Sequence, residues 1–180
     1  MIKKIFKTNL KGLKLFKTNT FKDKRGYFEE IFNKKELLKK LNIKFTNRLV
    51  CVSFSKKNVI RGFHFQKQNP IDQIVYVQKG KILDVVIDIR KNSRTFGQYE
   101  KFILSEKNKK ILFMPKGFAH GFCALEKENV IIYNLSEYYK KNYDTGFRWD
   151  DIRINIKWPT DKPIVSKKDR SLLNFDEIKF

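Results

Sequence analysis

The feature that most limits how this chain can fold is its long succession of short apolar stretches separated by turn residues. Turn signals stand at Lys79-Gly80-Lys81 and Pro115-Lys116-Gly117, and others recur about every 8–12 residues. No helical pattern alternates with these stretches, which argues against a parallel α/β sheet. We therefore predict an antiparallel sandwich, jelly roll or barrel. Its expected strands are Leu49–Phe54, Val59–Phe65, Ile74–Gln78, Ile82–Ile89, Tyr99–Leu104, Ile111–Met114, Phe118–Leu125 and Val130–Tyr139.

The N-terminal region fits the same plan. Residues 1–20 contain short strand-like stretches, and Asp23-x-Arg25-Gly26 marks a turn into an aromatic strand. Asn33 is expected to cap a short helix. The apolar face of that helix should carry Leu37, Leu38 and Leu41.

The C-terminal region, after Trp158-Pro159, reads as a tail packed on the barrel. Its expected anchors are Leu172, Leu173 and Phe175. The sequence thus predicts a single all-β domain over residues 1–180, with one or two short helices.

The formal net charge of +21 raises the question of a nucleic-acid or membrane partner. The lysines, however, come in short runs spread evenly along the chain, and no basic block or basic amphipathic helix concentrates them. We interpret them as a solvated coat whose field attracts an anionic substrate such as a sugar diphosphate. We expect no nucleic-acid partner.

The two cysteines, Cys51 and Cys123, lie far apart in apolar strand-like contexts. They are expected to be buried thiols in a reducing compartment rather than a disulfide. The segment Met1–Lys11 lacks the apolar core of a signal peptide, and no stretch is long enough to span a membrane. We expect a cytoplasmic protein with no membrane partner.

Side chains able to do chemistry are few, because the chain has only two histidines, His64 and His120. There is no His-x-His or Cys-x-x-Cys pair, so we predict no metal site. Dinucleotide, P-loop and serine-hydrolase motifs are also missing. What remains is acid–base chemistry, for which an imidazole such as His64 is well suited. Spacing alone does not select the carboxylate or acid that would act with it, and His64 alone fits an ordinary strand histidine equally well.

Several motifs occur together in an order that resembles a known family. The motifs are Asp23-x-Arg25-Gly26-x-Phe28, Arg61-Gly62-Phe63-His64-Phe65-Gln66, Leu83-Asp84-Val85-Val86-Ile87-Asp88-Ile89-Arg90, Ser93-x-Thr95-Phe96-Gly97, Pro115-x-Gly117-Phe118-Ala119-His120-Gly121-Phe122, Trp149-Asp150-Asp151 and Trp158-Pro159. With these motifs the chain resembles, over about nine-tenths of its length, the dTDP-4-dehydrorhamnose 3,5-epimerases, which act on nucleotide-linked 4-keto-6-deoxy sugars.

The resemblance implies a cupin-like jelly roll, a homodimer that exchanges N-terminal strands, and no metal or organic cofactor. It also implies proton abstraction next to a ketone and reprotonation on the opposite face, in the synthesis of sugars for surface polysaccharides. The implied catalytic residues are His64 as base, Asp169 as its carboxylate partner and Tyr133 as acid. The implied substrate-binding residues are Arg61, Arg25, Glu30, His120, Gln66 and Gln73, with Arg61 on the diphosphate and Arg25 and Glu30 reaching the nucleotide across the dimer. Asp84 and Asp88 are expected to be mainly structural, with Asp84 nearer the site.

Two departures from the family pattern leave the substrate open. Leu49-Val50-Cys51 replaces the usual Gln-Asp-Asn, and Gln73 stands where the family has a lysine that can stabilise an oxyanion. The nucleotide therefore need not be dTDP. A C3-only epimerase of a GDP-linked 4-keto heptose and a non-catalytic sugar-nucleotide-binding homologue remain alternatives. For individual residues, Tyr133 also fits a core position and Asp169 a surface tail, while His120 also fits a role in shaping the pocket.

Overall fold

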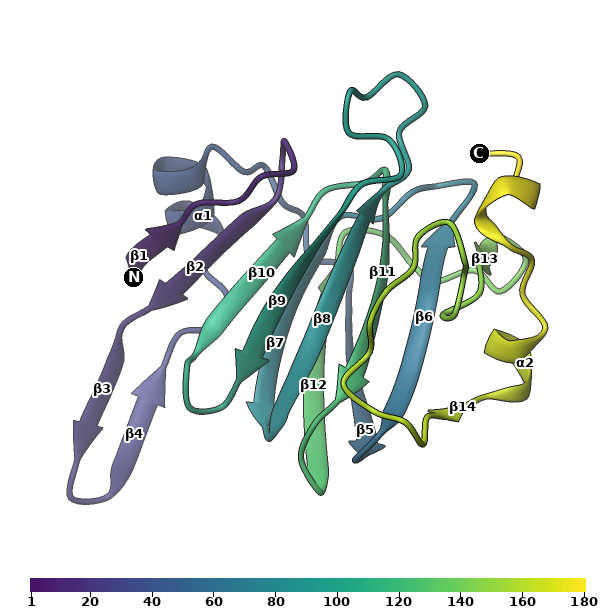
Figure 1. Cartoon of the computed structure of the whole chain (residues 1–180). Coiled ribbons are helices and arrows are strands. Elements are labelled where there is room, and N and C mark those ends of the chain that lie inside the picture. The colour runs from purple at the N-terminus through teal and green to yellow at the C-terminus, as the bar shows by residue number, and fades with distance from the viewer.

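The structure is a computed structural model that describes residues 1–180. Two antiparallel sheets pack face to face, which confirms the predicted all-β, cupin-like jelly roll (Figure 1). The first sheet has six strands in the order β1 (Ile2–Phe6), β2 (Lys14–Thr18), β10 (Lys110–Met114), β7 (Gln73–Lys79), β12 (Glu128–Leu135) and β5 (Leu49–Lys56). The second has the order β13 (Asp144–Gly146), β6 (Val59–Gln66), β11 (Phe118–Ala124), β8 (Lys81–Asp88) and β9 (Tyr99–Ser105), with β14 (Ile164–Val165) parallel to β6.

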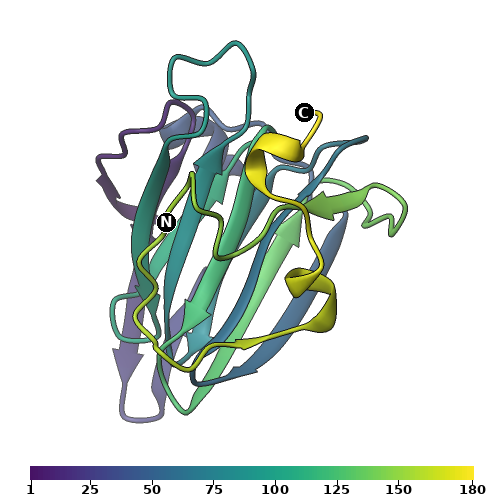
Figure 2. The same ribbon diagram turned by 45° about the vertical axis from the view of Figure 1, so that its right-hand side comes forward.

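Smaller elements surround this sandwich. A separate hairpin of β3 (Thr20–Asp23) and β4 (Gly26–Glu29) projects away from it (Figure 1). Helix α1 (Lys34–Leu41) lies near β1 and β2, whereas α2 (Lys167–Arg170) and the 3₁₀ helix η1 (Phe175–Glu177) belong to the C-terminal tail. In Figure 2 this tail runs in front of the second sheet.

Apolar side chains fill three layers. Between the sheets, β-branched and aliphatic side chains such as Val77, Val86 and Leu104 are fully buried. A second cluster lies between α1 and the outer face of the first sheet, and a third lies between the tail and the outer face of the second sheet. At one end of the sandwich, the inward positions of β6, β11 and β12 carry polar side chains rather than apolar ones, and the two sheets do not close there.

The expectation for α1 was largely right. Asn33 caps the helix by accepting a hydrogen bond from the Glu36 N–H at 3.2 Å. Leu37 and Leu41, one turn apart, are buried, but Leu38 is 47% exposed because it points away from the sheet. Its prediction as part of the buried face was wrong.

Three further predictions need correction. The strand expected to reach Tyr139 ends at Leu135, and Tyr139 lies exposed beyond it. In the tail, Phe175 is buried as expected, Leu172 is only partly buried and Leu173 is 53% exposed. Leu173 contributes its backbone instead, since its carbonyl accepts the N–H of Arg148 at 2.9 Å.

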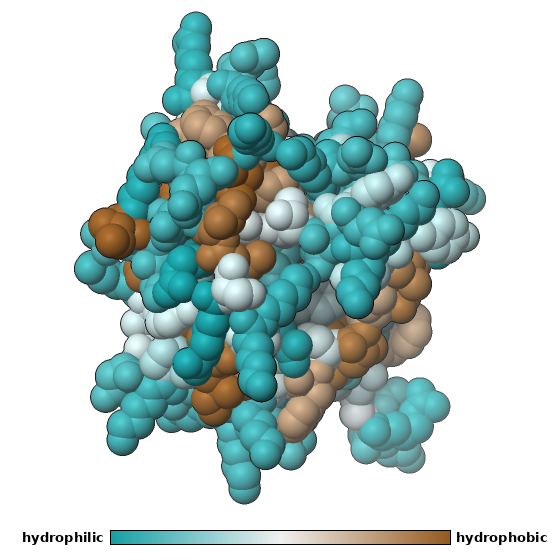
Figure 3. All heavy atoms as spheres, turned by 90° about the vertical axis from the view of Figure 1, so that its right-hand side faces the viewer, coloured by the Kyte–Doolittle hydropathy of each residue, from teal (hydrophilic) through white to brown (hydrophobic).

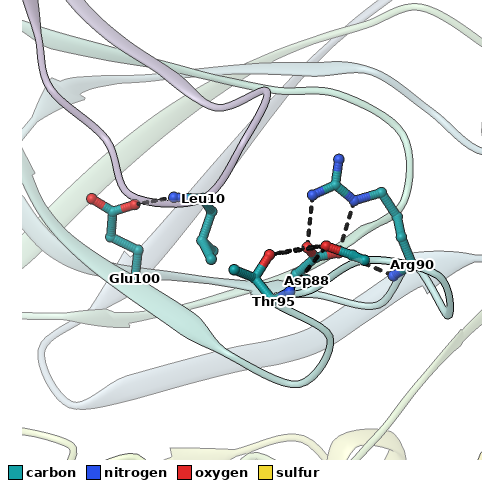
Figure 4. Close-up of polar contacts among 6 residues, drawn as sticks. Leu10, Asp88, Arg90, Thr95 and Glu100 are labelled. Carbon is teal, nitrogen blue, oxygen red and sulfur yellow. Dashed lines mark hydrogen bonds and ion pairs between the residues drawn. The ribbon is translucent and has the colours of Figure 1, made fainter.

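A buried carboxylate organises the loop after β8. Asp88 is fully buried and accepts hydrogen bonds from the Arg90 guanidinium and from the Ser93 and Thr95 hydroxyls (Figure 4). Burial by itself raises the pKa of Asp88, but these donors outweigh it and lower the pKa to about 2. In the same view, Glu100 accepts the Leu10 N–H and so ties the N-terminal loop to β9 (Figure 4).

The β6–β11 pair is unusually close because of a glycine. A Cβ added to Gly62 would lie 2.5 Å from the Gly121 Cα and 2.8 Å from the His120 carbonyl oxygen. Gly62 also has a φ of +123°, a region that side chains with a Cβ rarely adopt. Gly26, in the turn of the projecting hairpin, has a φ of +137° but open space around it.

We predict that Asp88→Asn lowers the free energy of unfolding by about 2 kcal/mol at neutral pH. The variant lacks the carboxyl group whose lowered pKa stabilises the folded state. A depressed native pKa stabilises the folded state above the unfolded pKa, and this stability is lost as pH falls through the native value. The difference in free energy of unfolding between wild type and variant should therefore decrease from pH 4 towards pH 2, as measured by urea denaturation. The exposed Asp161→Asn is the control. A difference that stays constant over this range contradicts the prediction.

We predict that Gly62→Ala destabilises the protein by about 1–3 kcal/mol more than Gly26→Ala does. Both variants place a Cβ at an unfavourable φ, but only the first also drives it into the neighbouring strand. Thermal and chemical denaturation of the two proteins measure the difference. Equal losses of stability in the two variants would contradict the prediction, because they would show that β11 moves to accommodate the added Cβ without destabilising the fold.

Candidate active site

A cleft of about 1080 Å³ opens between the two sheets. Side chains of β6 and β11 line it from the second sheet, and side chains of β7 and β12 line it from the first. The tail closes one side with residues from β14 and α2. On the face that carries the tail, hydrophilic side chains predominate, with hydrophobic patches between them (Figure 3).

His64 of β6 and Asp169 of α2 form a close pair in this cleft. His64 Nε2 lies 2.8 Å from Asp169 Oδ1, while Asp169 Oδ2 accepts the Gly62 N–H at 3.3 Å. The histidine side chain is 34% exposed and the carboxylate 4%. Burial works to raise the pKa of Asp169, but His64 and the Gly62 and Ser166 donors hold it below its usual value. The carboxylate therefore stays ionised and fixes the orientation of the imidazole.

His120 of β11 stands directly opposite His64 in the strand register. Its Nε2 lies 2.7 Å from Asp84 Oδ2 of β8, and both residues are buried. The second oxygen of Asp84, Oδ1, is buried without a hydrogen-bond partner. Asp84 thus lies next to the cleft while Asp88 holds the loop beyond β8.

Tyr133 enters the cleft from β12, on the opposite sheet. Its ring centroid lies 6.4 Å from that of His120. Burial raises the pKa of Tyr133 well above that of an ordinary phenol, and a hydrogen bond with Ser53 opposes this only in part. Tyr133 is therefore protonated at neutral pH.

The remaining expected residues near the cleft have distinct contacts. Arg61 Nε donates to Ser55 Oγ at 3.1 Å, and its Nη2 donates to the Phe54 carbonyl. Gln73 begins β7 and lines the cleft. Gln66 also lines it, but its amide is occupied by the Lys140 N–H and the Asn69 carbonyl.

Arg25 and Glu30 lie outside this cleft. Arg25 is in the turn of the projecting hairpin, where it pairs with Asp23 at 2.6 Å. Glu30 follows β4 and pairs with the N-terminal amine. Within one chain the structure does not bring these two residues to His64.

Sequence reasoning missed a cluster at the edge of the cleft. Asp144 Oδ2 accepts a hydrogen bond from the Tyr139 hydroxyl at 2.9 Å and pairs with the Lys168 ammonium. All three residues line the cleft. Only the position of Lys168, next to Asp169, offered a signal in the sequence, because the other two lie in a polar stretch without periodicity.

The cysteines are only partly as expected. Cys123 is buried, and burial raises its pKa to about 11. Cys51 is half-exposed, so its prediction as a buried thiol was wrong. It lies on β5, an edge strand of the first sheet that is paired only with β12.

No group of three or more His, Cys, Asp or Glu side chains is arranged to hold a metal ion. None of the helices has the length and apolar character needed to cross a membrane.

The arrangement is suited to moving protons across a bound ring. An imidazole held by a carboxylate can accept a proton from one side of a substrate. A protonated phenol on the facing sheet can donate one to the other side. Arg61 and the exposed Lys67, Lys116 and Lys168 give the cleft a positive field for an anionic substrate.

Relatives of this chain share its sequence over nearly its whole length. A family model described as dTDP-4-dehydrorhamnose 3,5-epimerase matches residues 7–177. The dTDP-4-dehydrorhamnose 3,5-epimerase of Methanothermobacter thermautotrophicus is 40% identical over 172 residues, which cover 93% of this chain and 92% of that protein. The enzyme of the same name from Escherichia coli K12 is 38% identical over 176 residues, covering 97% and 95%.

Solved structures agree with the fold. A dTDP-6-deoxy-D-glucose-3,5-epimerase from Legionella pneumophila, in complex with dTDP-4-keto-L-rhamnose, superposes with a TM-score of 0.94 at 34% identity, covering 97% of this chain and 94% of that one. A dTDP-4-dehydrorhamnose 3,5-epimerase from Bacillus anthracis, with TDP and PPi bound, gives 0.91 at 41% identity, covering 95% and 98%. This chain therefore belongs to the dTDP-4-dehydrorhamnose 3,5-epimerase family, and it is an isomerase that acts on nucleotide-linked sugars.

Proposed function

We propose that this protein inverts both C3 and C5 of a dTDP-linked 4-keto-6-deoxy sugar. One observation carries the proposal: an imidazole–carboxylate pair on one wall of the cleft faces a protonated phenol on the other wall. Inversion at carbon needs a base and an acid on opposite faces of the ring, and two facing sheets supply them. The names of the relatives support dTDP and two centres, and they do not favour a GDP-linked heptose or a non-catalytic homologue.

In the proposed reaction, the 4-keto group acidifies the hydrogens on C3 and C5. His64 removes one of these protons through Nδ1, since Nε2 is occupied by Asp169. The electrons move into an enolate whose oxygen is the former ketone oxygen, and Tyr133 then delivers a proton to the opposite face of the carbon. The same steps at the second carbon complete the reaction.

Other residues stabilise and hold the substrate in this scheme. Asp169 stabilises protonated His64, and Arg61 binds the diphosphate. His120, backed by the buried Asp84, and Gln73 both line the cleft, and in this scheme they donate hydrogen bonds to the developing oxyanion. Gln73 brings no charge, so this chain relies more on its histidine than a lysine-bearing relative would.

The test is proton exchange in D2O. We expect the protein to introduce two deuterium atoms into dTDP-4-keto-6-deoxyglucose, as followed by mass spectrometry, and to leave the GDP-linked counterpart unchanged. His64→Asn and Tyr133→Phe should each slow exchange by about 10²–10⁴-fold. One deuterium would indicate a single-centre enzyme, and none would contradict the proposed function.

We also propose that the protein is a homodimer in which the β3–β4 hairpin of each chain covers the cleft of its partner. The hairpin exposes Phe21, Tyr27 and Phe28 at 51–66%, although a two-stranded ribbon is rarely stable alone. The outer face of β5 likewise exposes Val50 and Val52. Such surfaces are typical of an interface, and this arrangement would bring Arg25 and Glu30 to the nucleotide.

Subunit mixing tests this arrangement. Arg25→Ala and His64→Asn proteins should each have little activity alone. When they are unfolded together and refolded as a mixture, about half of the dimers are mixed, and each has one intact site. Activity should then return to roughly a quarter of the wild-type value. Mixtures that stay inactive, while light scattering shows monomers, would contradict the exchange of hairpins.

A further inference from the structure

A buried polar network joins the projecting β3–β4 hairpin to the first sheet. Glu29, the last residue of β4, accepts a hydrogen bond through Oε2 from the Tyr76 hydroxyl of β7 at 2.8 Å, and the same oxygen lies 3.3 Å from Lys109 Nζ. Lys109 also donates to the hydroxyls of Tyr27 at 2.9 Å and Tyr76 at 3.2 Å. Only 3% of the Glu29 side chain and 16% of the Lys109 side chain are exposed. One ammonium group therefore holds two residues of the hairpin.

The groups that hold the hairpin come from well-supported parts of the fold. Tyr76 is fully buried and packs in the cluster between α1 and the first sheet. Lys109 belongs to the turn between β9 and β10. In that turn, Asn108 Oδ1 accepts hydrogen bonds from the backbone N–H groups of Ser105 and Lys110 at 3.1 and 3.0 Å. The base of the hairpin is thus attached to a buried strand and to a braced turn.

The charges of this network make it directional. Burial by itself lowers the pKa of Lys109, but the hydrogen bonds to Tyr27 and Tyr76 and the charge of Glu29 outweigh burial and raise the pKa. Lys109 is therefore charged at neutral pH. A buried ion pair adds little stability over apolar side chains of similar volume, because both charges lose their hydration. Its hydrogen bonds need a defined geometry, however, so the network restricts the orientation of the hairpin more than it stabilises the fold.

The network also determines which face of the hairpin stays free. Side chains alternate along β4, so Tyr27 and Glu29 lie on one face and Phe28 lies on the other. Phe28 pairs across the hairpin with Phe21, their ring centroids lie 6.4 Å apart, and both rings are exposed. Because Tyr27 and Glu29 are held by Lys109, the aromatic face is turned away from the turn that carries this lysine.

Building on the proposed function and its dimer, we propose that Glu29 and Lys109 are positioning residues, which set the direction in which the hairpin carries Arg25 to the partner's cleft. Arg25 lies in the turn between β3 and β4, at the far end of the hairpin from Glu29 (Figure 1). Four residues of strand span roughly 13 Å, so a tilt of about 15° at the base moves the tip by roughly 3 Å. A shift of that size breaks a hydrogen bond between Arg25 and a nucleotide.

The decisive variant replaces the three polar groups by apolar ones of similar volume, with Glu29→Met, Tyr76→Phe and Lys109→Met in one protein. It leaves no buried charge unpaired, so we expect its free energy of unfolding to match or exceed that of wild type. We expect KM for dTDP-4-keto-6-deoxyglucose to rise about tenfold and kcat to change less than about twofold, because a misplaced Arg25 weakens binding without altering the chemistry. A triple variant with the stability and the KM of wild type contradicts the proposal.

A double-mutant cycle tests whether the network acts through Arg25. The triple replacement should raise KM in the wild-type background and leave KM nearly unchanged in the Arg25→Ala background. A general disturbance of the structure would raise KM by the same factor in both backgrounds. Lys79→Met is the matched control, since it removes the lysine of an exposed ion pair with Glu128, and it should keep the wild-type KM.

The outcomes separate this inference from the proposed function. Wild-type protein that introduces no deuterium into the substrate contradicts the proposed function, and an Arg25→Ala protein with wild-type KM contradicts the approach of the hairpin to the nucleotide. Where both of these expectations hold, a KM increase of equal size in the two backgrounds contradicts only the role of the network. If the triple variant does not fold, Tyr76→Phe takes its place, because it keeps the ion pair and removes its hydrogen bonds to β7.

Discussion

The close pairing of β6 with β11 is the constraint on which the rest of the site depends. It sets His64 opposite His120, and Gly62 allows the two backbones to approach. The same stretch of β6 presents the Gly62 N–H to Asp169. One strand pair therefore fixes both imidazoles and the contact for the carboxylate that holds one of them.

Burial raises the pKa of both Asp88 and Tyr133, and the hydrogen-bond partners of each group decide whether burial prevails. Asp88 is fully buried yet has a pKa of about 2, because Arg90, Ser93 and Thr95 all donate to it. Tyr133 has a single hydroxyl beside it, so burial prevails and the phenol keeps its proton. One protein can thus hold an ionised buried carboxylate and a neutral buried phenol at the same pH.

The sequence was informative where the chain is regular and where its motifs are specific. Strand spacing predicted the all-β sandwich, and the Asn33 cap was visible as a residue type in its expected place. The contact of Asp169 with His64 could be expected only from the family resemblance, because the two residues belong to elements brought together by the tail. The exposure of Leu38 and Leu173 was not predictable from hydrophobicity, since it depends on which side of each element meets a sheet. The cluster of Asp144 with Tyr139 and Lys168 joins the stretch after β12 to the C-terminal tail and leaves no periodic pattern in the sequence.

The distance in sequence between the two halves of the imidazole–carboxylate pair has a consequence for how the protein is made. His64 and Asp169 lie 105 residues apart, and Asp169 follows all strands of both large sheets in the chain. At ribosomal speeds of about 5–20 residues per second, roughly 5–20 seconds separate the synthesis of the two residues. Nascent chains can therefore assemble the sandwich while its histidine still lacks its carboxylate, and the imidazole–carboxylate pair forms only when the last segment docks.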